Sequence, residues 1–495
     1  MKMPSKPPVF RELLASTAPE QLGGILDAGR RAAKGEYLHW DKLRHLSPPD
    51  GLTHLQWWTG IKLYRLTANR SVPLRDKSGG FFEFSVVQEV EAALHQIDRG
   101  VGGKLSVPEP VTNPHTRDRY IISTLMEEAI TSSQLEGAAT TREVAKEMIR
   151  SGRTPRDSGE RMILNNYVTM RRITELKDQP LTPELVFEIH RLVTHGTLEK
   201  ADAAGRFRRA DENIRITDFE GTEFHLPPPA AELPQRLAQM CDFANGASTD
   251  TFIHPALRAI ILHFWLAYDH PFVDGNGRTA RALFYWAMLH QGYWLFEFIS
   301  ISHVLRKAPA QYARSFLYTE TDGNDLTYFI LAQVEVVKQA IQALYAYIER
   351  KTSETRDLES HLRAVGRFNH RQAEIIRHAL KHRDHQYTIE SHQRSHDVTY
   401  QTARTDLGVD AAQLIHIHAI EHNLEAKVGF VGTGSQHAAA SVAEGESKQA
   451  VVVLHDKDSR DAGGITGGQR IFETAVEKQE PVRVTPVLRR QEYRS

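Results

Sequence analysis

The sequence contains almost no cysteine. Cys241 is the single cysteine among 495 residues, so an internal disulfide is impossible, and so is a zinc or iron–sulfur site built from several cysteines. Packing and hydrogen bonds must therefore hold the chain together. We expect it to fold in a reducing compartment, where thiols stay reduced.

Long apolar runs are also missing. Residues 1–10 contain no run of signal-peptide length, and the most apolar stretch, residues 259–268, includes His263. The charges nearly cancel, with 61 Lys and Arg against 62 Asp and Glu, so no net field attracts the chain to nucleic acid or to an anionic membrane. We expect a cytoplasmic protein without a membrane partner, and any contact with nucleic acid must be local.

The apolar fraction of 41% is that of a folded protein, and the length suggests roughly two or three domains. From about residue 118 to 350, apolar residues recur three and four positions apart, which predicts a mainly α region. Cap signals place helices at 182–196, at 254–270 and at 278–291.

Two other patterns interrupt or follow the helices. Alternating apolar residues on both sides of Glu220-Gly221, from Ile214 to Leu226, predict a short β-hairpin. Three short helices, at 371–381, 389–396 and 399–408, suggest a helix-turn-helix module. Residues 432–468 are rich in small and polar residues, and we expect that segment to be flexible.

The segment from His270 to Arg281 lies between two predicted helices. Gly275, Asn276, Gly277 and Arg278 place backbone N–H groups at a helix N-terminus, which is a site for phosphate oxygens. The glycines let the backbone approach an anion closely and adopt dihedrals that side chains forbid. The turn therefore predicts a phosphate-binding site, with Asn276 as a further donor.

The side chains of this segment match the needs of phosphoryl or nucleotidyl transfer. His270 is the candidate base, and Asp274 is the single carboxylate able to hold Mg²⁺. Arg278 and Arg281 supply positive charge for a polyphosphate. The alternative is a helix–helix corner in which the glycines only make the turn, His270 caps a helix and Asp274 pairs with Arg278.

The segment resembles the signature of the Fic (filamentation induced by cAMP) family, HPFx[DE]GNGRxxR in one-letter code, at every fixed position. The resemblance implies that His270 deprotonates a target hydroxyl, which attacks the α-phosphate of ATP, so AMP is transferred and pyrophosphate leaves. Asp274 would hold Mg²⁺, with Mn²⁺ as the alternative metal. Gly275, Asn276 and Gly277 would form the anion hole, while Arg278 and Arg281 bind the distal phosphates. Glycine at position 277, where kinases of the family carry lysine, favours AMP transfer.

Two further segments agree with this family. Gly205-Arg-Phe-Arg208 resembles the G-x-[YF]-R element before the family's flap, a hairpin that docks the target by strand pairing. Ile214, Ile216 and Phe224 would then form the docking surface. Without the resemblance, the hairpin and Arg208 read as ordinary surface features.

A second motif lies upstream of the loop. Ser132 and Glu136 are four residues apart, on one face of a helix that Gly137 can end. Alone this is a solvated polar face. It resembles the family's inhibitory motif [ST]xxxE[GN], which implies that Glu136 pairs with Arg281, blocks the γ-phosphate site and keeps basal activity low.

The resemblance also implies a domain order. We expect an N-terminal mainly helical region (1–117), an inhibitory helix with connecting helices (118–178), a Fic-type helical bundle with the hairpin flap (179–350), a winged-helix-like module (365–430) and a flexible tail (431–495). In the module, Tyr400, Gln401, Arg404 and the cluster at 381–383 would face DNA, or the module would dock a protein.

Several alternatives stay open at this point. Expected partners are ATP, a protein target with an accessible hydroxyl, the chain itself as a target, and a second copy in a homodimer. Removal of AMP from the modified target is an alternative reaction. A nucleotide-sensing DNA-binding regulator and a phosphate-binding scaffold without catalysis are alternative functions.

Overall fold

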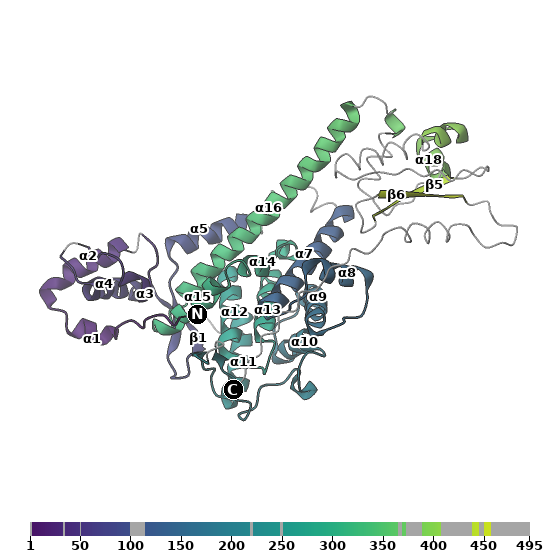
Figure 1. Cartoon of the computed structure of the whole chain (residues 1–495). Coiled ribbons are helices and arrows are strands. Elements are labelled where there is room, and N and C mark those ends of the chain that lie inside the picture. Colours follow the sequence, from purple (N-terminus) through teal and green to yellow (C-terminus); the bar gives the residue numbers. More distant parts are fainter. Residues whose placement is uncertain are drawn as a thin grey trace, which may run out of the picture. The chain divides into compact units, whose positions relative to one another are not determined.

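The computed structural model is mainly α-helical, which confirms the predicted fold class (Figure 1). It describes residues 2–32, 35–49, 51–99, 114–217, 221–247, 251–364, 369–372, 389–406, 438–444 and 450–456. These fall into two compact units, Met1–Glu354 and Thr355–Ser495. No helix in the described part has the length and apolar content needed to cross a bilayer.

The first unit begins with a group of short helices that have their own small core. They are α1 (Phe10–Ala15), α2 (Leu22–Ala32), α3 (Trp40–Leu43) and α4 (His54–Leu66). Trp58 and Leu43 are fully buried among them. Gly29 and Gly60 allow α2 and α4 to touch, because a Cβ at Gly29 would lie 2.1 Å from the Gly60 carbonyl oxygen. A larger residue at either position would separate the two helices.

The next element is a β-hairpin, although the sequence predicts a mainly helical region over residues 1–117. Strands β1 (Arg70–Arg75) and β2 (Phe81–Phe84) pair in antiparallel fashion. Val72 and Phe82 lie in the large hydrophobic core, so one face of the hairpin is covered by the helical bundle. Helix α5 (Gln88–Ile97) comes next.

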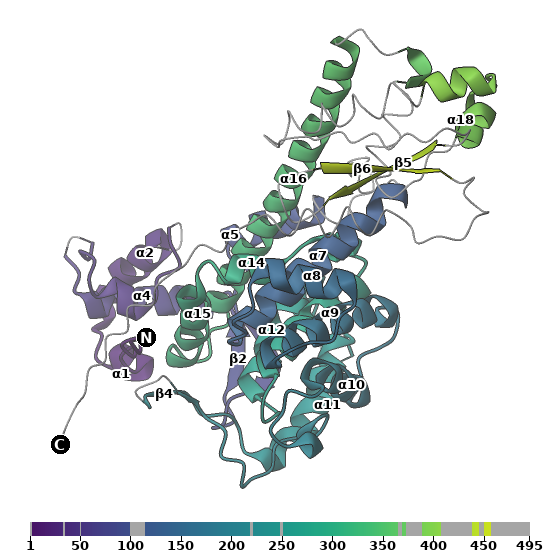
Figure 2. The ribbon, with the colours of Figure 1, turned by 45° about the vertical axis from the view of Figure 1, so that its right-hand side comes forward.

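The bundle of the first unit surrounds two central helices. Its elements are α7 (Pro114–Leu135), α8 (Arg142–Ser151), α9 (Ser158–Leu176), α10 (Pro183–Thr194), α11 (Leu233–Ala244), α12 (Pro255–Asp269), α13 (Asn276–His290), α14 (Ile301–Leu305), α15 (Pro309–Thr321) and the first part of α16 (Thr327–Ala364). Helices α12 and α13 pack on each other, α9 and α10 contact α13, and α11 contacts α12 (Figures 1 and 2). Nearly every residue of α12 and α13 is buried, as expected for helices that are covered on all sides.

Local signals explain where these helices begin and end. Thr182 caps α10 by accepting the Leu185 N–H, and Pro183 occupies its first position. Helix α12 ends at Asp269, as predicted. Helix α13 begins at Asn276 rather than Arg278, because Gly275 takes a left-handed conformation and its carbonyl accepts the Thr279 N–H.

The predicted second hairpin is present as β3 (Ile216–Thr217) and β4 (Glu223–His225). Ile216 pairs with His225 and Thr217 with Glu223. Phe219 and Glu220, expected at its tip, lie outside the described residues. A short two-stranded element such as this one has little stability alone and depends on its contacts with the bundle.

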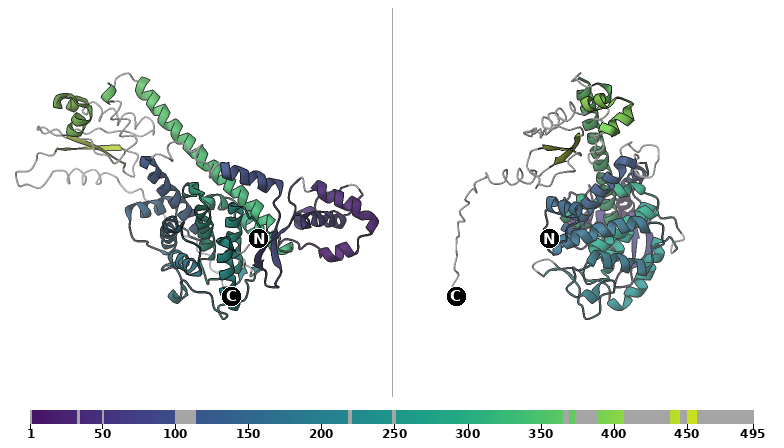
Figure 3. Two further views of the ribbon diagram at one scale, coloured as in Figure 1. Left: turned by 180° about the vertical axis from the view of Figure 1, so that it is seen from behind. Right: turned by 90° about the vertical axis from the view of Figure 1, so that its right-hand side faces the viewer.

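The second unit is described only in pieces. It contains α18 (Ile389–His396), a helix at 400–406, and strands β5 (Ala438–Glu444) and β6 (Ala450–Asp456). Asp406 accepts hydrogen bonds from Asn369 and Arg371, so the start of the predicted first helix lies beside the end of the third. Most of the expected helix at 371–381 and the cluster at 381–383 lie outside the described residues, so the winged-helix-like module stays a prediction. Helix α16, which carries the boundary between the units, is long and continuous (Figure 3).

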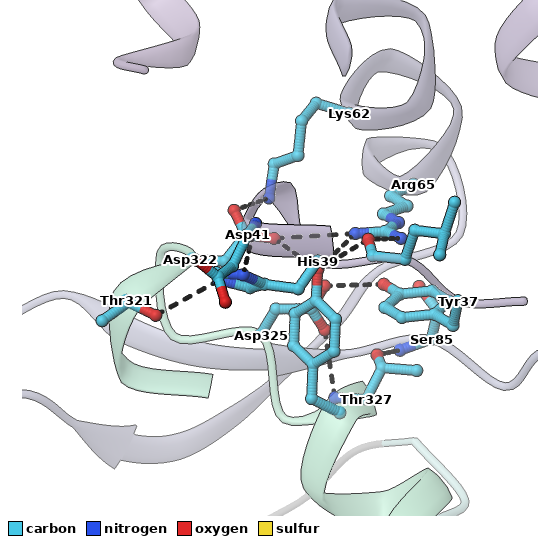
Figure 4. Close-up of polar contacts among 12 residues, drawn as sticks. Tyr37, His39, Asp41, Lys62, Arg65, Ser85, Thr321, Asp322, Asp325 and Thr327 are labelled. Atoms are coloured by element: carbon cyan, nitrogen blue, oxygen red, sulfur yellow. Dashed lines mark hydrogen bonds and ion pairs between the residues drawn. The ribbon is translucent and has the colours of Figure 1, made fainter. Parts of the chain in front are cut away.

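A buried polar cluster joins the N-terminal helices to the turn between α15 and α16 (Figure 4). Arg65 of α4 donates to the Tyr328 hydroxyl at 2.7 Å and to the Leu38 carbonyl at 2.8 Å, and its guanidinium lies 3.6 Å from the Tyr37 ring centroid. Asp322 accepts from Lys62 at 2.9 Å and lies 3.6 Å from Arg65. Because the Arg65 side chain is only 6% exposed, its charge depends on these partners.

We expect Arg65→Met to lower the free energy of unfolding by about 3 kcal/mol or more, because it leaves buried acceptors without their cation. Arg30 is the matched control, since its ion pair with Asp27 is exposed. The Arg30 side chain is 69% exposed and that of Asp27 is 60% exposed. Arg30→Met should cost about 1 kcal/mol or less. Urea unfolding followed by tryptophan fluorescence measures both variants, and equal losses would contradict the role given to the cluster.

Candidate active site

The loop between α12 and α13 has two residues in the left-handed conformation. His270 has φ 44° and Gly275 has φ 81°. A Cβ at Gly275 would lie 2.6 Å from Cγ2 of Thr194 on α10, so the loop also packs too closely for a side chain there. The result is a tight turn that aims the first-turn N–H groups of α13, which lack intrahelical partners, away from the helix.

Asn276 fixes the shape of this turn. Its amide nitrogen donates to the Phe272 carbonyl at 2.9 Å, and its amide oxygen accepts the Phe272 N–H at 3.0 Å. The side chain is buried. Asn276 therefore closes the loop on itself, and one amide hydrogen and its backbone N–H are left for the anion site predicted from the sequence.

His270 is held as a neutral imidazole. Its Nδ1 lies 3.3 Å from the Ala267 carbonyl oxygen, so Nδ1 carries the proton and Nε2 keeps its lone pair. Burial, aided by the neighbouring His225 and Arg208, lowers its pKa from 6.5 to about 4. The ring is therefore unprotonated near neutral pH, as a base requires.

Arg208 clamps the backbone around His270. Its Nε donates to the His270 carbonyl at 2.8 Å, its Nη2 donates to the Pro228 carbonyl at 2.5 Å, and its own N–H donates to the Pro271 carbonyl at 2.8 Å. Arg208 is 8% exposed, so the reading of it as a surface charge does not hold. It belongs to the scaffold of the loop.

His190 is a residue of the site that the sequence reading missed. Its Nδ1 accepts the Gly205 N–H at 2.9 Å, which leaves Nε2 as the donor to the Asp274 carbonyl at 2.9 Å. The ring stacks on Phe272 at 3.7 Å, and burial lowers its pKa to about 4. A single histidine among the apolar residues of α10 carries no sequence signal of this role.

Asp274 and Arg278 lie at the mouth of the loop. The Asp274 carboxylate is 57% exposed and lies 3.3 Å from Nη2 of Arg278. Arg278 is buried and also donates to the Val193 carbonyl at 3.0 Å, while its Nε has no hydrogen-bond partner among the described residues. Asp274 thus pairs with Arg278, as the alternative of a plain helix–helix corner also predicts. The carboxylate of Asp274 stays accessible to solvent in this pair.

Arg281 contacts the upstream motif. Its Nε donates to Ser132 Oγ at 2.9 Å, and its Nη2 donates to the Ser132 carbonyl at 3.0 Å and to Glu136 Oε1 at 2.8 Å. Burial opposes ionisation of Glu136, but Arg281 outweighs it and holds the pKa of that carboxyl below its usual value. Helix α7 ends at Leu135, and Gly137 follows with φ 94°. The structure thus brings Ser132, Glu136 and Arg281 together.

The hairpin residues Ile214, Ile216 and Phe224 are half-buried. The hairpin is attached to the site at the end of β4, where His225 lies 2.7 Å from the Tyr268 carbonyl oxygen of α12. In the described part of the chain, no group of three or more His, Cys, Asp or Glu gathers as a metal site. The one carboxylate at the loop is that of Asp274.

Comparison with known proteins gives a consistent match to this region. Residues 180–288 match the family model described as Fic/DOC family. A protein adenylyltransferase Fic from Nematostella vectensis is 32% identical over 117 residues, which cover 24% of this chain and 25% of that protein. A protein adenylyltransferase fic-1 from Caenorhabditis briggsae is 37% identical over 108 residues, covering 22% and 19%. The match thus spans about a quarter or less of each relative.

Solved structures of similar arrangement exist as well. A Fic family protein from Desulfovibrio desulfuricans has a TM-score of 0.47 and 19% sequence identity, covering 65% of this chain and 88% of that one. Fic-1 from C. elegans has a TM-score of 0.43 and 19% identity, covering 70% and 92%.

The neutral state of His270 can be tested directly. Its pKa of about 4 predicts that the ring stays neutral as the pH falls from 7 to 5 and takes up a proton only near pH 4. NMR titration of histidine ring carbons measures this, and the signal is assigned by its loss in His270→Ala. A midpoint near 6.5 would show that burial and the neighbouring cations do not act on this ring.

Proposed function

We propose that this chain, whose residues 180–288 match the Fic/DOC family model, transfers AMP from ATP to a Ser, Thr or Tyr hydroxyl of a protein target. One observation carries the proposal. A neutral histidine, His270, with a free Nε2 lies one short loop away from the N-terminus of a buried helix that can bind phosphate.

The residues of the loop divide the reaction among them. His270 Nε2 takes the proton of the target hydroxyl, whose oxygen bonds to the α-phosphorus of ATP, while the bond from that phosphorus to the bridging oxygen breaks and pyrophosphate leaves. First-turn N–H groups of α13, at Asn276, Gly277 and Arg278, face the charge on the transferring phosphate. Arg278 and Arg281 neutralise the distal phosphates.

Asp274 is suited to a divalent cation bound together with the substrate. A single exposed carboxylate fits Mg²⁺ in such sites, because the cation keeps several waters and takes its other ligands from phosphate oxygens. Mn²⁺ is an alternative. When bound, the cation would supply charge neutralisation of the phosphates, and Asp274 is the residue that would hold it.

Glu136 would act as a built-in inhibitor. Arg281 already donates to Ser132 and Glu136, so a γ-phosphate would have to displace the carboxylate to reach the guanidinium. A carboxylate beside that phosphate also repels it. ATP would therefore bind without the alignment that in-line attack requires, and basal transfer would be slow.

Removal of AMP from a modified target is the second candidate reaction. It is favoured by the ionised state of Glu136, whose pKa is held below its usual value and which faces both Arg281 and His270. A carboxylate in that place could orient a water molecule towards the phosphate. The same glutamate would then inhibit the forward reaction and assist the reverse one.

Replacing Glu136 tests the inhibitory contact. We expect Glu136→Gly to raise self-labelling from α-labelled ATP by roughly tenfold or more, because Arg281 becomes free for the γ-phosphate. Glu136→Gly combined with His270→Ala should give no label. The matched control is Glu147→Gln, which removes an exposed carboxylate on α8 that pairs with Arg153 and should leave labelling at the level of the parent.

Equal labelling of the parent, the Glu136→Gly protein and its His270→Ala derivative would overturn the proposed function. Label that rises in Glu136→Gly but persists without His270 would overturn the role of the base alone.

Asp274 gives a separate test of the cation. In the Glu136→Gly background, Asp274→Asn should raise the concentration of Mg²⁺ needed for half-maximal labelling by about tenfold, since the amide is a weaker ligand. Excess EDTA should stop labelling by both proteins. If the Glu136→Gly proteins with and without Asp274→Asn need the same Mg²⁺ concentration for half-maximal labelling, Asp274 is not a ligand of the cation.

A further inference from the structure

His225, the last residue of β4, connects the hairpin to the bundle. Its Nε2 lies 2.7 Å from the Tyr268 carbonyl oxygen of α12, and its Nδ1 lies 2.7 Å from Oε2 of Glu320 on α15. The His225 side chain is 6% exposed and that of Glu320 is 22% exposed. Both contacts are therefore largely shielded from water.

The two partners of His225 are both acceptors. A carbonyl oxygen cannot donate, and neither can an ionised carboxylate, so each ring nitrogen must carry a proton to make both hydrogen bonds. His225 is then an imidazolium paired with Glu320. The pair is neutral as a whole, but its cation lies nearer to α12.

The position suits a cation. Tyr268 lies in the last turn of α12, where carbonyl groups lack intrahelical partners and the helix dipole favours positive charge. The neighbouring carbonyl of Ala267 accepts from the His270 ring, and that of His270 accepts from Arg208. His225 supplies the missing donor for Tyr268, so each of these three carbonyls has a side-chain partner.

We propose that His225, held by Glu320, is a positioning residue for AMP transfer. It fixes β4 of the flap to the turn of α12 that precedes His270, and it places a positive charge beside that base. This inference rests on the proposed function, because a base in need of positioning exists only if the chain transfers AMP.

The other charged groups nearby do not replace this cation. Asp269 and Arg236 form a buried ion pair at 2.7 Å, in which burial raises the pKa of Asp269 to about 6. Replacing His225 or its partner leaves this pair in place, so it acts alike in the parent and in the variants. Tyr268 packs against the His225 ring at 4.8 Å and stays neutral, since burial raises its pKa well above the usual value. Arg208 also faces His270 and acts in the same direction as His225.

Glu136, which directly follows α7, also faces His270 and raises its pKa. His225 and Arg208 therefore oppose Glu136. Removing the charge of His225 should raise the pKa of His270 and move the acid side of the pH–rate profile to higher pH.

Two variants separate the charge of His225 from its position. In Glu320→Gln, the new amide can donate to Nδ1 while Nε2–H still donates to Tyr268, so both bonds persist with a neutral ring. In His225→Phe, both bonds and the charge are lost. Glu335→Gln, which removes an exposed carboxylate of α16 that pairs with Lys338, is the matched control.

The experiment measures self-labelling rates from α-labelled ATP between pH 3 and 9, with each variant made in the Glu136→Gly protein. We expect Glu320→Gln to move the acid limb upwards by about half a pH unit or more with kcat within roughly threefold of the parent. His225→Phe should show the same shift and lower kcat by about tenfold or more, with KM for ATP unchanged. Glu335→Gln should match the parent.

The outcomes distinguish this inference from the proposed function. If the Glu136→Gly parent takes up no label, the proposed function itself fails. If the parent is labelled and both variants keep its pH profile, the inference is wrong, even where His225→Phe lowers kcat, because a purely structural role would do that. Circular dichroism melting curves show whether each variant folds. If His225→Phe does not fold, the pH profile of Glu320→Gln alone tests the inference.

Discussion

The carbonyl groups at the C-terminal end of α12 are the constraint on which the site depends. A buried helix cannot leave these acceptors unsatisfied, because each would cost about 1–3 kcal/mol. Arg208, His225 and the ring of His270 itself satisfy the carbonyls of this turn. The requirement of the helix end therefore selects the tautomer of His270 and leaves its Nε2 free. A structural need and the proposed chemistry are met by the same hydrogen bond.

The electrostatics of the loop follow from burial together with neighbouring charge. Burial, together with the neighbouring His225 and Arg208, lowers the pKa of His270 to about 4, and burial is also the largest cause of the lowered pKa of His190, so both rings serve as neutral groups with fixed tautomers. Arg281 responds differently, because a guanidinium cannot lose its proton and must find partners. Ser132 and Glu136 are those partners. The contact proposed to be inhibitory is thus one that a buried arginine requires in any case.

Much of this could be predicted from local sequence. The caps at Thr182 and Pro255, the loop from 270 to 281 and the hairpin around Gly221 all carry signals that depend on near neighbours, and the structure has helices and strands there. The roles of His190 and Arg208 could not be predicted, because the loop carbonyls that they contact, those of Asp274 and His270, lie 84 and 62 residues away in the chain. The β1–β2 hairpin was missed for the same reason, since its buried face is defined by helices from elsewhere in the sequence.

Gly277 shows why the proposed inhibition and the proposed catalysis would compete for one place. A Cβ at this position would lie 2.2 Å from Glu136 Oε1 and 3.2 Å from Nη1 of Arg281. The Glu136 carboxylate therefore fills the space above Gly277, which is also where a phosphate would meet the first N–H groups of α13. One glycine serves both states, since it has no side chain to exclude either anion. Glu136 and a nucleotide could not occupy that space together in their preferred positions, so the proposed inhibition needs no distant conformational change. It would follow from two negatively charged groups that share one site and one arginine.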